Sequence, residues 1–272
     1  GNIFGAKTFQ WFLVLNGIIG PVLLGGAVAT FFNGSNFVVN KMNITNSLQP
    51  VISQWANGSH GLDALLDPWN LVLGLAVMFL SRILGTFYII NNVNDAAIQE
   101  RSKRQLLVNT VPFLVLFLSF LIRTLLKDGF AENVNDGSIY MEPMKYLNNF
   151  VTMWYLLVVL LVGVLMLLYA LGKTLFTKNY TKGIWFAGIG VVLVVLSLLL
   201  CAGWNHTAYY PSNIDIQSSL TISNSCSSLF TLQTMSVVSI LVPFVVAYIA
   251  YVWYVMDKKK LDKEELKDDE LY

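Results

Sequence analysis

The chain has 272 residues, of which 56% are hydrophobic and only 12% are charged. Soluble domains carry roughly 25% charged residues, and a soluble fold of this length could not cover so much apolar surface with so few polar groups. The net charge of +1 gives no basis for binding nucleic acid. The two cysteines, Cys201 and Cys226, lack the paired spacing of a zinc site or a disulfide framework.

Six segments are long and apolar enough to cross a membrane. A bilayer core of about 30 Å requires roughly 20 apolar residues in a helix, and lipid leaves every backbone polar group to be satisfied within the segment. The predicted spans are about 9–32, 70–91, 106–126, 151–172, 184–203 and 229–255. The sequence therefore predicts one all-α transmembrane domain over residues 1–272, a polytopic helix bundle that ends in a charged tail at 257–272.

The loops between these segments alternate in charge. Loops on one side hold twelve of the seventeen basic residues, and those on the other hold only Lys41, Lys127 and Lys145. The twelve are Lys7, Arg101, Lys103, Arg104, Lys173, Lys178, Lys182, Lys258, Lys259, Lys260, Lys263 and Lys267. The positive-inside rule assigns this basic side to the cytoplasm. Both visible ends are therefore predicted to be cytoplasmic.

The first span is rich in small residues. Gly25 and Ala29 are four positions apart and share a helix face, with Gly17 and Gly26 nearby. Small residues let a neighbouring helix approach closely, so we predict a packing face here. A hinge at Pro21 is the alternative interpretation of the same segment.

The longest outer loop, 33–69, is rich in Gly, Asn and Ser. Such composition favours irregular structure, and a short interfacial helix is predicted near 47–56. Glycosylation sequons begin at Asn33, Asn43, Asn57 and Asn205, and they matter only if the protein follows a eukaryotic secretory route.

The spans contain no recognisable catalytic or haem-binding group. Both histidines, His60 and His206, fall in outer loops, and no Asp or Glu lies within a predicted span. Haem iron is held by His, Met, Cys or Tyr. Among the span residues the methionine thioethers are weak candidates for a haem ligand, because methionines in such positions more often serve packing. These are Met78, Met153, Met166 and Met235. We predict no catalytic, cofactor-binding or metal-binding residue in this chain.

Arg82 is the exception to this apolar pattern, because it lies in the middle of the second span. A charge at that depth costs at least about 2.5 kcal/mol, so a partner is expected. One interpretation is a polar ligand or partner subunit; the other is a buried contact with Asn16 or Asn109 in neighbouring spans. Arg123 lies near the outer end of the third span and can reach the surface by snorkelling.

The second span and the C-terminal region resemble subunit II of the cytochrome bd quinol oxidases. At the second span, Asp67-Pro68-Trp69-Asn70-Leu71 enters the membrane and Gly74, Gly85 and Tyr88 follow. The C-terminal motifs are Pro211-Ser212, Ser219-Leu220-Thr221, Ser227-Ser228-Leu229, Thr231-Leu232, Met235, Leu241-Val242-Pro243, Tyr248 and Tyr251-Val252-Trp253-Tyr254. On this resemblance the chain covers roughly the last two-thirds of the subunit. The family's first three spans would then precede Gly1.

The resemblance implies a haem-free subunit in the cytoplasmic membrane of a bacterium. Its partner would be subunit I, which carries the b- and d-type haems and the quinol site, oxidises quinol, reduces dioxygen to water and generates proton-motive force. This chain would form a heterodimer with subunit I and belong to an oxidoreductase without carrying catalytic residues. The resemblance leaves open whether a small accessory subunit is present and whether lipid or quinone binds to this chain. The rival interpretation is a secondary transporter or a non-catalytic membrane scaffold.

Overall fold

The computed structural model describes residues 5–45, 51–177 and 180–256, and it is predominantly helical. Six of its helical segments have the length and apolar composition to cross a membrane. They are α1 (Gly5–Asn33), α2 (Pro68–Asn92), α3 (Ala96–Leu126), α5 (Trp154–Phe176), α6 (Gly183–Gly203) and the pair α7 (Leu229–Ser239) and α8 (Val242–Met256). The predicted all-α membrane class is confirmed. The predicted charged tail at 257–272 lies outside the described residues.

The helices extend beyond the hydrophobic segments because polar side chains cap them. α3 begins at Ala96, well before the predicted start at 106, since the Asp95 side chain accepts a hydrogen bond from Ile98 N at 3.0 Å. At α2, Asp67 accepts from Trp69 N at 2.7 Å and Pro68 occupies the first turn. Hydropathy reports only the part of each helix that lies in lipid, so it misses such polar turns.

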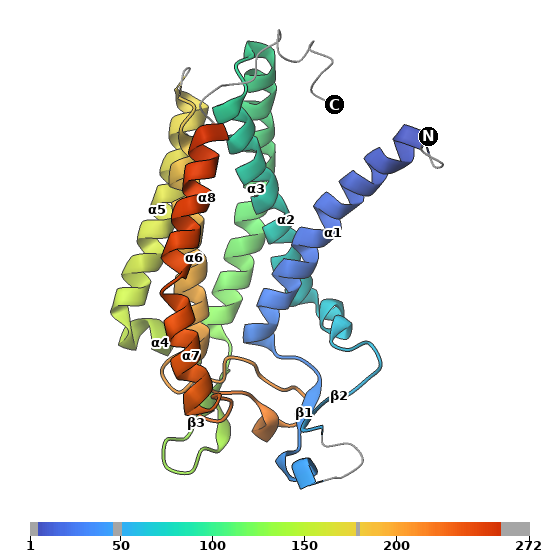
Figure 1. Cartoon of the computed structure of the whole chain (residues 1–272), viewed down its shortest axis with the longest axis vertical. Coiled ribbons are helices and arrows are strands. Elements are labelled where there is room, and N and C mark those ends of the chain that lie inside the picture. Colours follow the sequence, from blue (N-terminus) through green and yellow to red (C-terminus); the bar gives the residue numbers. More distant parts are fainter. Residues whose placement is uncertain (1–4, 46–50, 178–179, 257–272) are drawn as a thin grey trace.

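The bundle consists of two groups of helices (Figure 1). α2 lies between α1 and α3 and packs closely on both, whereas α5 and α6 pack closely on each other. At the α5–α6 crossing, a Cβ on Gly163 would lie 2.7 Å from Gly190 O, and one on Gly190 would lie 2.6 Å from Gly163 O. The two backbones approach this closely because neither residue has a side chain.

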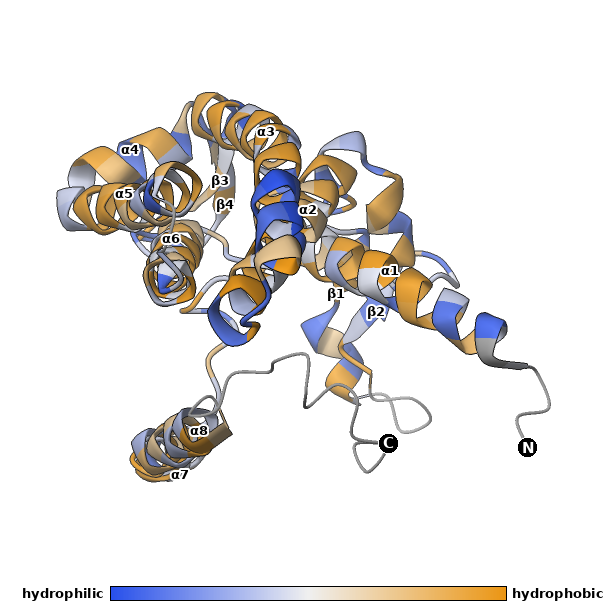
Figure 2. Ribbon diagram, turned by 90° about the horizontal axis from the view of Figure 1, so that it is seen from above, coloured by the Kyte–Doolittle hydropathy of each residue, from blue (hydrophilic) through white to orange (hydrophobic). Residues whose placement is uncertain are grey.

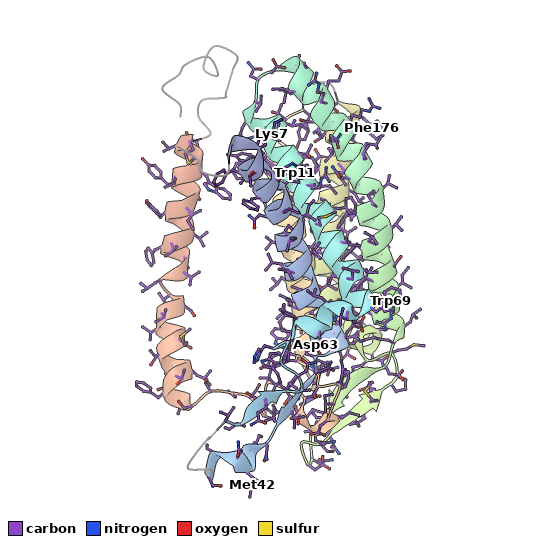
Figure 3. All side chains as sticks on the ribbon, turned by 90° about the vertical axis from the view of Figure 1, so that its right-hand side faces the viewer. Lys7, Trp11, Met42, Asp63, Trp69 and Phe176 are labelled. Carbon is purple, nitrogen blue, oxygen red and sulfur yellow. The ribbon has the colours of Figure 1, made fainter. Side chains whose placement is uncertain are left out.

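The last predicted span, 229–255, is two helices that stand apart from the bundle. Pro243 has no backbone N–H to donate, so the series of helical backbone hydrogen bonds is interrupted between Ser239 and Val242. Seen from above, the α7–α8 pair lies away from the other helices (Figure 2), and the side view shows it as a separate column (Figure 3). No residue from 229 to 256 is buried. The predicted span is confirmed as Leu229–Met256, and its interruption before Val242 was not predicted.

Short strands and helices cap the end of the bundle opposite the two described termini, which we call the outer end. β1 (Phe37–Val39) pairs antiparallel with β2 (Ser53–Trp55), and β3 (Gly129–Glu132) pairs antiparallel with β4 (Ile139–Glu142). Three 3-10 helices, Lys41–Thr45, Leu62–Leu66 and Ile216–Ser218, and the α-helix α4 (Lys145–Thr152) complete the cap. The interfacial helix predicted near 47–56 was wrong at Ser53–Trp55, which is a strand; residues 46–50 lie outside the described part. These loops fold as a unit, because Ser35 N donates to Pro211 O at 3.0 Å.

Both ends of the described chain lie at the same end of the bundle. α1 begins and α8 ends opposite the cap (Figure 1). Trp11 and Trp69 lie near opposite ends of the bundle, with Lys7 beside Trp11 (Figure 3). This spacing of tryptophans is typical of the two membrane interfaces.

Candidate functional site

The small residues of α1 divide into a packed group and an open one. A Cβ on Gly25 would lie 2.8 Å from the Cα of Gly74 on α2, and one on Gly26 would overlap the Leu65 side chain. Ala29 is fully buried. Around Gly17, by contrast, no atom lies within 4 Å of the Cβ position. α1 therefore packs on α2 through its outer half and leaves its inner half uncovered in the described chain.

Arg82 is exposed, and the structure does not bring it together with Asn16 or Asn109. Asn16 is exposed on α1, and Asn109 is buried but donates to Gln105 O of its own helix at 2.8 Å. The predicted buried contact among these three residues is not formed. The reason is the orientation of α2, which turns Ile83 into the bundle and thereby points the preceding residue outward.

A cluster of two cations lies at the outer end of the bundle, and sequence reasoning missed it. Asn33 Oδ1 accepts hydrogen bonds from Arg123 Nη1 at 3.1 Å and from Lys127 Nζ at 3.0 Å. Asn33 Nδ2 donates to Asn70 Oδ1 at 2.7 Å. Arg123 also lies over the Trp69 ring, 4.7 Å from its centroid. Arg123 thus ties α1, α2 and α3 together, and the Asn33 amide of the first sequon is occupied by this contact.

Lys127 is the most perturbed cation of this cluster. Its Nζ donates to Phe32 O at 2.6 Å and lies 5.6 Å from the centroid of the Tyr146 ring. Burial, with a smaller contribution from the nearby Arg123 charge, lowers the pKa of Lys127 from 10.5 to about 8 against the opposing effect of Asp67. The folded chain therefore holds this proton less tightly than the unfolded chain does.

This pKa predicts a specific dependence of stability on pH. Below pH 8 both states are protonated and the cost of burying the charge is present in full. Between about pH 8 and 10.5 the unfolded chain binds the proton more strongly, so the free energy of unfolding rises with pH, by about 3 kcal/mol at most. We expect the stability of the wild type to rise with pH relative to that of Lys127→Met, which lacks the titrating group. The measurement is the difference between the thermal unfolding midpoints of the two proteins at successive pH values. A difference that stays constant from pH 7.5 to 10.5 would contradict the assignment.

A second polar network joins α4 to α6 beneath the cap. Asn149 Nδ2 donates to Cys201 O at 2.9 Å and to Thr207 Oγ1 at 2.8 Å, and Asn205 Nδ2 donates to Asn149 Oδ1 at 2.9 Å. Asn149, Asn205, Thr207 and the Cys201 carbonyl satisfy one another, so we interpret the network as structural. Cys201 is buried and Cys226 is exposed outside this network, and both are free thiols.

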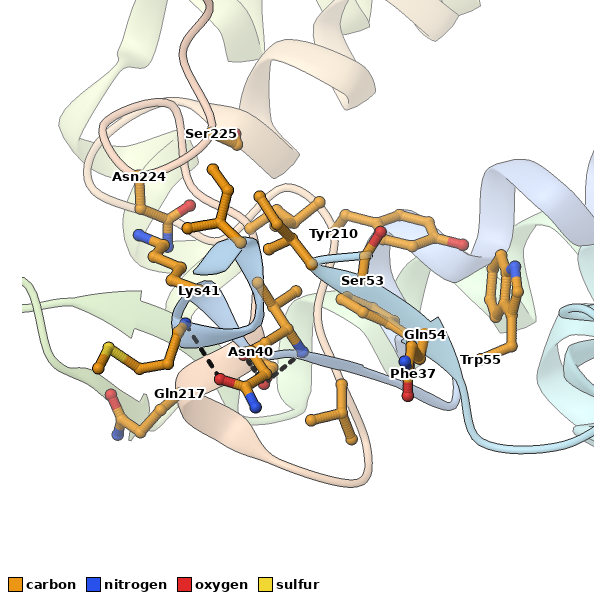
Figure 4. A pocket seen from close by; sticks show the side chains of 17 residues that line it. Phe37, Asn40, Lys41, Ser53, Gln54, Trp55, Tyr210, Gln217, Asn224 and Ser225 are labelled. Carbon is orange, nitrogen blue, oxygen red and sulfur yellow. Dashed lines mark hydrogen bonds between the residues drawn. The ribbon is translucent and has the colours of Figure 1, made fainter. Parts of the chain in front are cut away.

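One cavity lies within the bundle and another within the cap. The cavity within the bundle has a volume of about 310 Å³ and lies among α1, α2, α3, α5 and α6. Only apolar side chains line it, so it can hold hydrocarbon but cannot orient a polar substrate. The second, about 1010 Å³, is an open groove along β1 and β2 (Figure 4). Phe37 stacks on Tyr210 there, with ring centroids 5.3 Å apart, and Lys41 is the single charged residue of its described lining.

The described residues do not fit a haem. His60 and His206 are exposed in the cap, and a haem within the bilayer needs an axial ligand inside a span. The four thioethers lie on different elements: Met78 on α2, Met153 before α5, Met166 on α5 and Met235 on α7. Within the described ranges no three His, Cys, Asp or Glu side chains gather as a metal site would require. We derive no haem chemistry on this chain.

Comparison with known proteins identifies the family. Residues 3–256 match the family described as cytochrome bd terminal oxidase subunit II. Curated proteins show no match to the chain. The matched region holds all six candidate spans, together with the Asp67-Pro68-Trp69 entry of α2 and the C-terminal motifs from Pro211 onward. The chain is a multi-pass membrane protein that belongs to the cytochrome bd terminal oxidase subunit II family.

Proposed function

We propose that this chain is the haem-free subunit II of a cytochrome bd-type oxidase and that it packs against a haem-bearing subunit I. The pair oxidises quinol, reduces dioxygen to water and contributes to the proton-motive force. The match of residues 3–256 to the subunit II family carries this proposal. Within the complex the chain completes the heterodimer and shields the haem-bearing side from lipid; the haems and the quinol site lie in subunit I.

The uncovered helices support a role in assembly. α7 carries Thr231, Gln233 and Thr234 on an exposed surface, and the described bundle buries no residue of α7 or α8. Membrane helices associate through close packing and interhelical hydrogen bonds, in which polar side chains of this kind take part. A helix pair with these groups and no neighbour within the described chain is suited to contact a further subunit.

The charge distribution supports an orientation in a bacterial cytoplasmic membrane. The end of the bundle at which α1 begins and α8 ends (Figure 1) also holds Lys7, Arg101 and Lys173. The cap at the opposite end is poor in basic residues. By the positive-inside rule the basic end is cytoplasmic and the cap faces outward.

Purification with a visible spectrum tests the proposal. The full-length protein, tagged on this chain and expressed with its neighbouring genes, is extracted in detergent, and a reduced-minus-oxidised spectrum is recorded. We expect a second membrane subunit to co-purify with b- and d-type haem bands. A colourless protein that purifies alone would refute the proposal.

A secondary transporter is the second candidate, because α7 and α8 form a discontinuous helix. Transporters place such breaks beside a polar substrate site, usually in matching halves of the chain. Here the break at Pro243 lies on an exposed helix pair, and α1 runs through Pro21 as one helix. The spectrum separates the two candidates, since a transporter has no haem bands.

A further inference from the structure

Arg82 places a positive charge on a membrane-facing surface of α2, deep in the bilayer. It lies fourteen residues from Pro68 and ten from Asn92, the two ends of α2. At 1.5 Å per residue these separations are about 21 Å and about 15 Å. The middle of this 25-residue helix is Leu80, so Arg82 lies only about 3 Å from the middle, against about 15 Å for half of a hydrocarbon core. The backbone of Arg82 therefore lies within the apolar region.

The part of α2 around Arg82 is covered neither by α1 nor by the core of the bundle. Ile83 and Phe87 are fully buried in the bundle, and Gly74 contacts α1. Gly85 lies on the same side of α2 as Gly74 but eleven residues further along, beyond this contact, and Arg82, Gly85 and Ile89 are all exposed within about 60° of one another by the 3.6-residue period. Around Gly85 no atom lies within 4 Å of the Cβ position, so a neighbouring helix has room to approach beside Arg82.

The guanidinium has no counterion within the described chain. No hydrogen bond, ion pair or ring contact reaches the Arg82 side chain from residues 5–45, 51–177 or 180–256. The described carboxylates cannot supply one, because they lie in the cap, in the inner loops or in the polar first turns of α3, as Glu100 does. Its counterion must come from elsewhere.

Depth decides between a lipid phosphate and a protein carboxylate. Cα–Cβ bonds tilt toward the helix N-terminus, so the Arg82 side chain leaves α2 toward Pro68, the more distant end. Its three methylenes and guanidinium are much shorter than the separations of about 15 Å and about 21 Å between Arg82 and the two ends of α2. A phosphate at either surface is out of reach, whereas an Asp or Glu on a spanning helix is not. Arginine is also suited to bidentate contact with a carboxylate.

We propose that Arg82 forms an ion pair with a carboxylate on a membrane-spanning helix of a partner subunit, and that this helix packs over Gly85. The inference rests on the proposed function, because it requires a partner in the membrane. It assigns the exposed face of α2 to the subunit interface and gives the partner helix a defined chemistry, an acidic residue near the bilayer centre.

Variants of Arg82 in the intact complex test the ion pair. We expect Arg82→Gln and Arg82→Glu to lower the amount of partner recovered per tagged chain by about tenfold or more, as truncation of one member of a buried charged pair does. Arg82→Lys keeps the charge and should lose less. Arg101→Gln, which removes an exposed charge at the inner end of α3, should leave recovery unchanged. Unchanged recovery in Arg82→Gln would overturn the proposal.

A crosslinking experiment identifies the neighbour even if the variants fold poorly. A photoreactive residue at Ile89, on the same face of α2, is activated in the otherwise unchanged complex; Leu165, exposed on α5, is the matched control. An adduct from position 89 to an acidic spanning segment of a separate subunit supports the proposal. Adducts only to lipid, or only to another segment of the same polypeptide, overturn it. If the complex carries its haem bands in either case, the proposed function stands; a wild-type chain that purifies alone removes both.

Discussion

Gly190→Leu is expected to lower the amount of folded chain in the membrane by at least tenfold. The position of its Cβ is only 2.6 Å from Gly163 O, a backbone atom that cannot turn aside, and 3.0 Å from Leu167 N. Overpacking a well-packed interior typically costs about 1–3 kcal/mol, and here α5 and α6 must separate to admit the side chain. Since proteins have only about 5–15 kcal/mol of stability, a change of this size should be visible as loss of extractable protein. The measurement is the yield of monodisperse protein in detergent, with its unfolding midpoint.

Gly188→Leu is the matched control for this substitution. Gly188 lies on the same helix, two residues away, and no atom is within 4 Å of its Cβ position. It should leave yield and midpoint close to the wild type, and Gly190→Ala should fall between the two leucine variants. An equal loss at both positions would show that the α5–α6 crossing is not responsible.

Asn33→Leu is expected to destabilise the outer end of the bundle by about 3–5 kcal/mol. The substitution removes the acceptor shared by Arg123 and Lys127 and the donor to Asn70. Hydrogen bonds to charged groups contribute about 1.5–3 kcal/mol each, and an apolar leucine cannot replace them. The thermal unfolding midpoint of the purified complex should fall by several degrees, as expected for a loss of this size.

Two further variants make the Asn33 prediction specific. Asn33→Asp restores an acceptor and adds a charge opposite in sign to both cations, so it should retain most of the stability that Asn33→Leu loses. Asn135→Leu changes an exposed turn residue in the cap and should shift the midpoint little. If Asn33→Asp is as unstable as Asn33→Leu, the cations do not depend on position 33.

The spans and their alternation are predictable from sequence because the requirement behind them is local. A segment in lipid must satisfy its own backbone hydrogen bonds, and the apolar run that does so can be counted without knowing its neighbours. The start of α3 at Ala96 and the break before Val242 also had local signals, in the Asp95 cap and in Pro243. Hydropathy smooths over both, so the predicted bounds differ from the observed ones.

The cap and the Asn33 cluster were not predictable, because they depend on contacts between distant parts of the chain. β1 and β2 are only three residues each and gain their stability from pairing with one another. Asn33 and Arg123 are 90 residues apart and meet only after α1, α2 and α3 have packed. The sequence requires no role for Arg123 beyond snorkelling, whereas its contacts with Asn33 and Trp69 tie three helices together.

The sequence alone determines that this protein is a bundle of membrane-spanning helices. Its apolar segments set the spans, its loop charges predict their orientation, and its motifs indicate the family. Tertiary structure decided which face of each helix is buried. Lipid accepts any apolar face equally well, so a hydrophobic span carries little information about its inward side. Packing alone set Gly163 against Gly190, turned Arg82 outward and left α7 and α8 without a buried residue in the described chain.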